Sequence, residues 1–235
     1  MLKALFFDLF GTVVDWRNSV IKQLEKKNFF VKDKINLEEF VINWRLKYLP
    51  ILKKVNNKDI SWKKLDELHL IILNEVCHEM KIKPLSENDK LVILDFWHKL
   101  NPWPDSSSAI NQLNKNFITA TLSNGNIALQ KDLLSYGNLN FDFIFSAEHF
   151  YKYKPHKVVY TGAVKHLNLK PHECALIASH KNDLLAASKC GLKTIYISRP
   201  KEYGAFKNKF VESNFTADIN VNSLKQIRTH LIKKF

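Results

Sequence analysis

The stretch Leu5-Phe6-Phe7-Asp8-Leu9-Phe10-Gly11-Thr12 decides the fold of this chain. Its apolar residues up to Phe7 are typical of a central strand of a parallel sheet, covered on both faces. Asp8 then stands at the carboxyl end of that strand, which is the edge where open α/β sheets bind ligands. Gly11 lets the chain turn away at once, and Thr12 can hydrogen-bond the Asp8 carboxylate or a ligand. An aspartate after a strand can also be a turn or helix-capping residue only, so the rest of the chain decides its role.

The composition indicates a globular protein built as one α/β domain with an insertion. The chain has 235 residues, 46% of them hydrophobic, and a mean hydropathy of −0.23. No apolar run approaches the roughly eighteen residues of a membrane span. The apolar run at the amino terminus is cut by Asp8 and is too short for a signal peptide. We therefore expect a cytoplasmic protein with no membrane partner.

The net charge of +13 raises the question of a nucleic-acid partner. Of the 36 basic residues, however, 32 are lysines, whereas recognition of bases and phosphates usually depends on the bidentate arginine side chain. The lysines are also spread along the chain without a dense basic block. We expect no nucleic-acid partner, and a solvated basic surface that modestly attracts anionic substrates.

The chain divides at the segment Asn101-Pro102-Trp103-Pro104-Asp105, because two prolines in three residues cannot continue a helix. Before it the pattern predicts helices only, at residues 18–27, 37–54, 61–82 and 86–100. After it strands at 117–122, 141–146, 174–179 and 193–198 alternate with helices at 127–136, 157–167 and 183–190. Such alternation predicts a parallel sheet with right-handed crossovers. The fold class is therefore α/β, with a doubly wound parallel-sheet core formed by residues 1–15 and 101–235 and an inserted helical cap domain at residues 16–100.

The string Phe7-Asp8-x-x-Gly11-Thr12 resembles the first motif of the haloacid dehalogenase (HAD) superfamily, whose members use this aspartate as a nucleophile. Most members are phosphatases with a second aspartate two residues later, which protonates the leaving alcohol; here that position is Phe10. An alkoxide needs a general acid to leave, whereas a halide leaves without a proton. Phe10 thus favours carbon–halogen cleavage, and the continuation through Arg17 resembles the type II, or L-2-haloacid, dehalogenases. The resemblance covers nearly the whole chain.

Two further motifs of that family have counterparts here. Ser123-Asn124-Gly125, at a predicted strand end, resembles the second motif, in which serine and asparagine hold the substrate carboxylate and line the site. Tyr153-Lys154-Pro155 resembles the third motif, whose lysine neutralises the nucleophile, and Tyr160 follows at the family's spacing as a hydrogen-bonding partner. A nearby ammonium keeps a carboxylate ionised beside an anionic substrate.

The fourth motif corresponds to the segment Ser179-His180-Lys181-Asn182-Asp183, with Ser179 among the catalytic candidates. The resemblance implies that Asp183 orients or deprotonates the hydrolytic water and holds the lysine. His180 is either a structural hydrogen-bonding residue or a group that relays the proton of the water. Asn182 stands where several members carry an aromatic residue of the halide cradle, and a polar amide there would favour a small, hard halide such as fluoride.

The cap should contribute one cation. Arg45, after Trp44, resembles the cap-helix arginine that accepts the departing halide and steers the substrate. Leu9, Phe10 and Leu49 are expected to shape an apolar substrate pocket.

The resemblance implies an (S)-2-haloacid dehalogenase that hydrolyses short 2-haloacids to 2-hydroxyacids through an aspartyl ester. Haloacetates, L-2-halopropionates and fluoroacetate are the candidate substrates. Lys154 and Arg45 can balance the charge of a monoanionic substrate, so no metal ion or other cofactor is expected. The expected partners are the substrate and water, with a homodimer as the family's frequent assembly. The alternatives are a magnesium-dependent phosphatase of a small metabolite and a binding protein that has lost catalysis.

Overall fold

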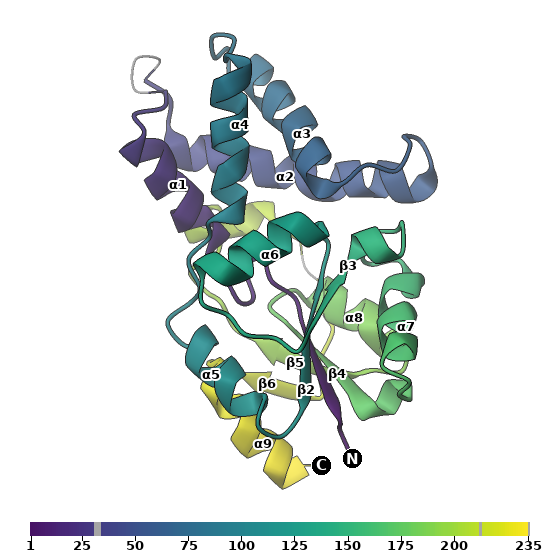
Figure 1. Ribbon diagram of the computed structural model, residues 1–235. Helices are drawn as coiled ribbons and strands as arrows, with labels where there is room; N and C mark the ends of the chain where they lie inside the picture. The colour runs from purple at the N-terminus through teal and green to yellow at the C-terminus, as the bar shows by residue number, and fades with distance from the viewer. Residues whose placement is uncertain (31–33, 212, 235) are drawn as a thin grey trace.

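The computed structural model describes residues 1–30, 34–211 and 213–234. Its centre is a six-stranded parallel sheet in the order β3-β2-β1-β4-β5-β6 (Figure 1). The expected central strand, β1, lies between β2 and β4. The strands are β1 Ala4–Phe7, β2 Ile118–Ser123, β3 Phe143–Ser146, β4 Cys174–Ala178, β5 Lys193–Ile197 and β6 Ile219–Val221.

The register of the sheet aligns the strand ends that carry the polar motifs. Phe7 of β1 pairs with Ile177 of β4, and Ser123 of β2 pairs with Ser146 of β3. Asp8, the residue after β1, therefore shares one edge of the sheet with the residues that follow β2 and β4. All strands are parallel, so this edge is the carboxyl edge of the whole sheet.

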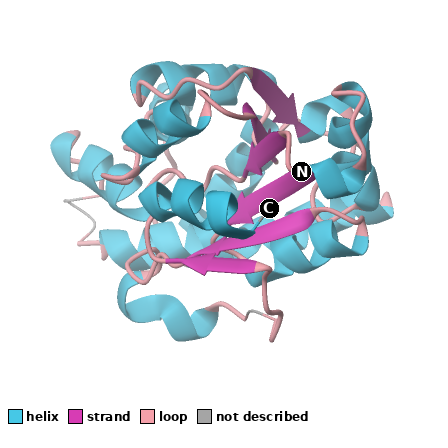
Figure 2. Ribbon diagram, turned by 90° about the horizontal axis from the view of Figure 1, so that it is seen from below, coloured by secondary structure: helices cyan, strands magenta, loops and turns pink. Residues whose placement is uncertain are grey.

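Helices cover both faces of the sheet, as Figure 2 shows from below. On one face Leu5 and Phe7 share a buried cluster with side chains of α5, α6 and α9, and on the other face Phe6 packs with side chains of α7 and α8. These helices are α5 Ser106–Leu113, α6 Ile127–Tyr136, α7 Lys157–His166, α8 Lys181–Lys189 and α9 Ile227–Lys234.

Four further helices stand beyond the carboxyl edge (Figure 1), and we call them the cap helices. They are α1 Trp16–Lys26, α2 Leu37–Asn57, α3 Leu65–Glu79 and α4 Glu87–Asp95. Side-chain caps define three of their starts: Asp15 accepts a hydrogen bond from the N–H of Asn18, Asn36 accepts one from the N–H of Glu39, and Ser86 accepts one from the N–H of Asp89. The division into a core domain and a cap domain at the expected boundaries stays a prediction.

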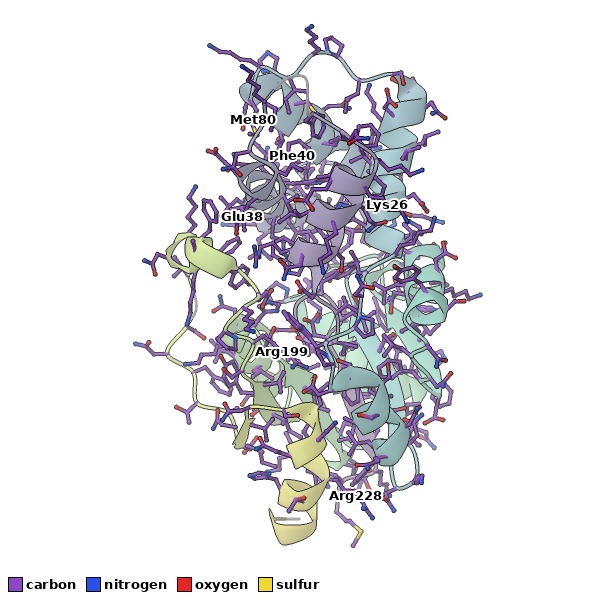
Figure 3. All side chains as sticks on the ribbon, turned by 90° about the vertical axis from the view of Figure 1, so that its left-hand side faces the viewer. Lys26, Glu38, Phe40, Met80, Arg199 and Arg228 are labelled. Carbon is purple, nitrogen blue, oxygen red and sulfur yellow. The ribbon has the colours of Figure 1, made fainter. Side chains whose placement is uncertain are left out.

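Aromatic packing joins the cap helices to the sheet. Trp97, in the 3-10 turn Phe96–His98 after α4, stacks on Trp16 with ring centroids 6.1 Å apart. It also contacts Trp44, at 5.4 Å, and Phe10, at 6.2 Å. All four side chains are buried, and they belong to the same hydrophobic cluster as β1. In Figure 3 side chains fill the space between the upper helices, which carry the labelled Phe40, and the sheet region around Arg199.

The structure shifts two predicted helices and adds elements that the pattern did not predict. The helix expected at 61–82 begins at Leu65, which leaves Trp62 in a loop, and the helix expected at 86–100 ends at Asp95. The added elements are α5, β6 and α9. Helix α5 begins with three serines, which are weak helix formers. Strand β6 has only three residues, which is too short for an alternation of apolar and polar residues to be recognised. Among the described helices, none combines the length and the apolar character that crossing a bilayer requires.

Gly11 is required where it stands, and its replacement tests this turn. Its φ is +86°, and a Cβ there would overlap the carboxylate of Glu202. We expect Gly11→Ala to lower the free energy of unfolding by about 1–3 kcal/mol, measured by urea denaturation. Gly137, with φ −84°, is the matched control, and its replacement by alanine should stay within about 1 kcal/mol of the wild type. If both variants lose the same free energy of unfolding, the turn does not specifically require glycine at position 11.

Candidate active site

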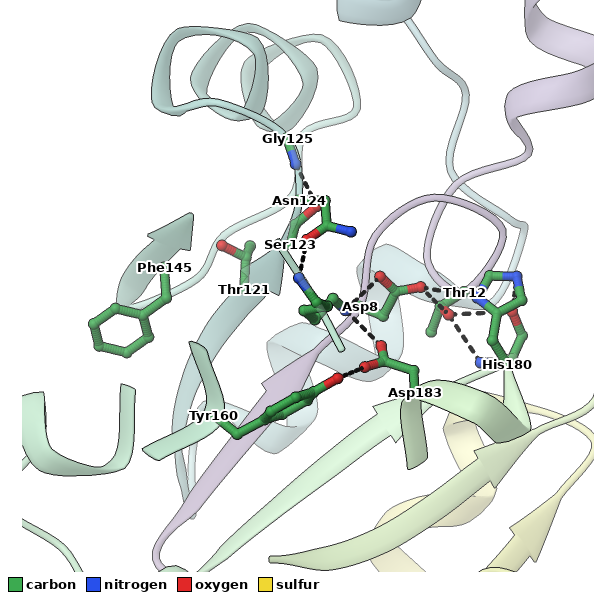
Figure 4. Close-up of polar contacts among 12 residues, drawn as sticks. Asp8, Thr12, Thr121, Ser123, Asn124, Gly125, Phe145, Tyr160, His180 and Asp183 are labelled. Carbon is green, nitrogen blue, oxygen red and sulfur yellow. Dashed lines mark hydrogen bonds and ion pairs between the residues drawn. The ribbon is translucent and has the colours of Figure 1, made fainter. Parts of the chain in front are cut away.

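Asp8 lies buried at the end of β1 with both carboxylate oxygens engaged (Figure 4). Oδ1 accepts a hydrogen bond from Lys154 Nζ at 2.9 Å, and Oδ2 accepts one from Thr12 Oγ1 at 2.9 Å. Burial raises the pKa of the Asp8 carboxyl, but Lys154 and His180 outweigh burial and hold this pKa well below its usual range. Asp8 is therefore an ionised and fixed carboxylate, and the predicted contact with Thr12 is confirmed.

Lys154 is a buried ammonium between two carboxylates. Its Nζ lies 2.9 Å from Asp8 Oδ1 and 2.5 Å from Asp183 Oδ2. Burial lowers the pKa of Lys154, but the two carboxylates outweigh burial and keep it above its usual range. The other oxygen of Asp183 accepts a hydrogen bond from Tyr160 OH at 2.5 Å. Both oxygens of Asp183 thus hold other groups of the site.

His180 lies between two acidic side chains. Its Nδ1 is 3.4 Å from Asp8 Oδ2, and its Nε2 is 2.9 Å from Glu202 Oε1. Burial lowers the pKa of this imidazole, but Glu202, Tyr203 and Asp8 outweigh burial and raise it well above its usual value. The side chain is therefore an imidazolium while Asp8 and Glu202 are both charged.

Glu202 is a site residue that the motifs did not reveal. Its side chain is buried, and its carboxylate accepts hydrogen bonds from Trp16 Nε1 at 3.0 Å and from Ser179 Oγ at 3.3 Å, besides the contact with His180. Burial raises the pKa of this carboxyl, but His180 and the other partners lower it below its usual value. The available signal was its position in the loop after β5, because that loop also starts from the carboxyl edge of the sheet.

The second motif and Ser179 also reach this edge. Asn124 accepts a hydrogen bond at Oδ1 from the backbone N–H of Lys154 at 2.7 Å, and Ser123 Oγ accepts one from the N–H of Gly125 at 3.2 Å. The N–H of Ser179 donates to Thr12 Oγ1 at 2.9 Å. Hydrogen bonds and ion pairs therefore link the predicted residues Asp8, Thr12, Asn124, Lys154, Tyr160, Ser179, His180 and Asp183.

Arg45 of α2 supplies a cation from the cap helices. Its guanidinium carbon lies 4.2 Å from the centroid of the Tyr48 ring and 5.4 Å from that of Trp16. Burial lowers the pKa of Arg45, but Tyr48, Glu202 and Asp8 are among the groups that outweigh burial and raise it. Within the part of the chain that the structure describes, this guanidinium makes no hydrogen bond or ion pair, so its donors are available to an anion.

The predicted pocket residues fall into two groups. Leu9 and Phe10 are buried next to Asp8 in sequence, whereas Leu49 is 59% exposed, so its pocket role stays a prediction. Asn182 is exposed, and its amide binds the backbone of Val211 and Ser213. The structure therefore gives no support to the expected halide contact of Asn182, because Asn182 uses its amide on the neighbouring loop.

The charges of the site nearly cancel before a substrate binds. Asp8, Asp183 and Glu202 face Lys154, Arg45 and the His180 imidazolium. Among the described residues no group of three His, Cys, Asp or Glu side chains has the geometry of a metal site. The arrangement can hold a carboxylate nucleophile, accept an anion at Arg45 and hold a transferable proton at His180.

Comparisons with known proteins agree with this geometry. Residues 2–191 match the family model of haloacid dehalogenase-like hydrolases. (S)-2-haloacid dehalogenase 4A of Burkholderia cepacia is 26% identical over 211 residues, which cover 86% of this chain and 87% of that protein. A solved L-2-haloacid dehalogenase matches all of both chains at 35% identity with a TM-score of 0.93. A solved defluorinating L-2-haloacid dehalogenase matches 98% of this chain and 95% of its own at 30% identity, with a TM-score of 0.91. The chain therefore belongs to the haloacid dehalogenase-like hydrolase family.

Proposed function

We propose that the protein is an (S)-2-haloacid dehalogenase that hydrolyses short 2-haloacids to 2-hydroxyacids with inversion. The observation that carries the proposal is an ionised, buried Asp8 beside the apolar Phe10. A halide needs no proton to leave, so this pair of residues suits carbon–halogen cleavage. The names of the relatives support the same substrate class. The protein is expected to act in the cytoplasm, and homodimer formation stays a prediction.

In the first step an oxygen of Asp8 attacks C2 of the haloacid from the side opposite the halogen. A C–O bond forms, the carbon–halogen bond breaks, and the halide leaves with the bonding electron pair. Arg45, whose guanidinium has no hydrogen-bond partner among the described residues, receives the halide together with Asn124. Ser123 and the neighbouring backbone bind the substrate carboxylate. Lys154 holds Asp8 in place for the attack.

In the second step water attacks the carbonyl carbon of the Asp8 ester, and the hydroxyacid leaves. Asp183 is poorly suited as the base, since one of its oxygens holds Lys154 and the other holds Tyr160. His180 is better placed, because Nδ1 faces Asp8 while Nε2 is held by Glu202. Ester formation removes the negative charge of Asp8 and so lowers the pKa of His180. The imidazole then loses its proton to solvent and takes a proton from the attacking water. As the acyl–oxygen bond of the ester breaks, the imidazolium gives this proton to the leaving alkoxide, so that the hydroxyacid is released and Asp8 is free again.

The phosphatase alternative lacks a group to protonate an alkoxide at position 10. Phe10 is buried and packs edge-on against Trp97, with ring centroids 6.2 Å apart. Without a general acid an alkoxide is a poor leaving group. No contact of the described residues favours a phosphate ester over a haloacid.

Halide release tests the proposed function directly. We expect the wild type to release halide from L-2-chloropropionate and chloroacetate in the presence of EDTA, and to leave D-2-chloropropionate intact. Asp8→Asn should release none, because an amide is not a nucleophile of this kind. Retained folding of the variant would be checked by thermal unfolding. Magnesium-dependent turnover of p-nitrophenyl phosphate without halide release would overturn the proposal in favour of a phosphatase.

The role of His180 as base predicts an accumulating ester. We expect His180→Gln to form the Asp8 ester but to hydrolyse it roughly 10²-fold or more slowly, so that intact mass shows a covalent adduct after incubation with L-2-chloropropionate. Asp183→Asn is the comparison. If the adduct accumulates in Asp183→Asn and not in His180→Gln, Asp183 is the base and our assignment is wrong.

The charge of Glu202 predicts a shift in the pH profile. Glu202 raises the pKa of His180, so Glu202→Gln should lower it, and the rising limb of kcat should move to lower pH. The same variant should lower the maximal kcat about 10-fold or more, since a neutral amide orients the imidazole and stabilises its charge less well. The measurement is kcat against pH with L-2-chloropropionate. If the rising limb of the kcat profile stays in place or moves to higher pH, the assigned pairing of Glu202 with His180 is wrong.

A further inference from the structure

Tyr153, the residue before Lys154, is held by the cap helices and their connections. Its side chain is buried, its ring stacks on Trp62 with centroids 4.7 Å apart, and its hydroxyl donates to the carbonyl of Lys63 at 2.7 Å. Trp62 and Lys63 lie in the loop between α2 and α3. A residue of the core is thus fixed by a segment from the other side of the active site.

Asn56, in the last turn of α2, adds the most specific of these contacts. Its Nδ2 donates to the carbonyl of Tyr153 at 2.8 Å, and its Oδ1 accepts from the N–H of Tyr153 at 2.9 Å. One side-chain amide therefore satisfies both backbone groups of the same residue, as a neighbouring strand would. The carbonyl of Asn56 also accepts from Lys152 Nζ at 2.8 Å. Asn56 thus binds two successive residues of the segment that leads to Lys154.

The next residue carries the ammonium of the site. The N–H of Lys154 is held by Asn124 of the core, and its Nζ reaches Asp8 and Asp183. The position of the Lys154 backbone is therefore set from two sides, by Asn56 through Tyr153 and by Asn124 directly. Displacing a charged group by about 1 Å in an active site can cost about 10²-fold in rate.

We propose that Asn56 is a positioning residue of the reaction, because it fixes the backbone of Tyr153 and thereby places Lys154. The charge balance at Asp8 then depends on the packing of the cap helices against the sheet edge. The inference rests on the proposed function, because it takes Asp8, the ion-pair partner of Lys154, as the nucleophile. According to this proposal, the contact between α2 and residues 152–154 affects the rate of the reaction. A displacement of the cap helices from the sheet edge would remove both hydrogen bonds of Asn56 and the ring partner of Tyr153 together, while the carbonyl of Tyr153 would keep the N–H of His156.

The test compares Asn56→Ala with a control that breaks another contact of the same region. Lys64→Met removes the ion pair between Lys64 and Glu148, 2.9 Å long, which also joins the α2–α3 loop to the core but does not touch Tyr153. We expect Asn56→Ala to lower kcat for L-2-chloropropionate roughly 10- to 100-fold with a change in KM of less than about threefold. Lys64→Met should leave both constants near the wild-type values.

Amide hydrogen exchange gives a second readout that does not depend on the substrate. Asn56→Ala should speed exchange at the N–H of Lys154, whose acceptor is Asn124 in the core, while amides of β5 exchange as in the wild type. Asn56→Asp, which keeps the acceptor for the Tyr153 N–H and loses the donor to its carbonyl, replaces the alanine variant if that variant does not fold. Unchanged kcat, or unchanged exchange at Lys154, would overturn the inference. Failure of the wild type to release halide would instead overturn the proposed function, and exchange would still report on the contact.

Discussion

The ion pairs of Lys154 with Asp8 and Asp183 are the interaction on which the rest of the structure depends. All three side chains are nearly removed from solvent, and the net value of such a buried group depends on complete pairing. Removal of the ammonium would leave two buried carboxylates without their partner, which typically costs about 3–5 kcal/mol. The carboxyl edge of the sheet brings the two aspartates together, and the segment that the cap helices hold brings the lysine. The fold and the chemistry therefore share one requirement, because the segments that meet here must all be in place to balance these charges.

The same charge balance separates the roles of the two residues that could activate water. The two oxygens of Asp183 hold Lys154 and Tyr160, so in the proposed mechanism this carboxylate serves as a fixed counter-charge. His180 instead contacts the one group whose charge changes, since Asp8 is an anion before attack and an ester afterwards. Glu202 holds the other nitrogen of the imidazole at 2.9 Å, and in the proposed mechanism it orients the ring in both states. Because Glu202 stays charged while Asp8 loses its charge in the ester, His180 can be protonated in the free enzyme and act as a base in the ester intermediate.

Much of the site could be predicted from the sequence, because Asp8, Asn124 and Ser179 directly follow strands. The central place of β1 accounts for Asp8, and the resemblance to the family's third motif accounts for Lys154 and Tyr160, which meet Asp8 and Asp183 in the structure. Glu202 and Asn56 could not be predicted, since each acts through a partner distant in sequence or across the interface with the cap helices. The expected halide contact of Asn182 stays a prediction: its position in the motif suggested the site, but its exposed amide binds the backbone of Val211 and Ser213. Local pattern places a residue at the sheet edge, whereas tertiary contacts decide where its side chain points.

Phe10 shows how closely chemistry and packing are joined in this protein. Its ring denies the site a carboxylic acid two residues after the nucleophile, which removes the acid that would protonate the leaving alkoxide of a phosphate ester. The same ring packs edge-on against Trp97, which stacks on Trp16 and contacts Trp44 of the cap helices. A carboxyl group at position 10 would therefore enter a buried aromatic cluster and face a desolvation cost there. The side chain that favours halide as the leaving group therefore also contributes to the packing of the cap helices on the sheet edge.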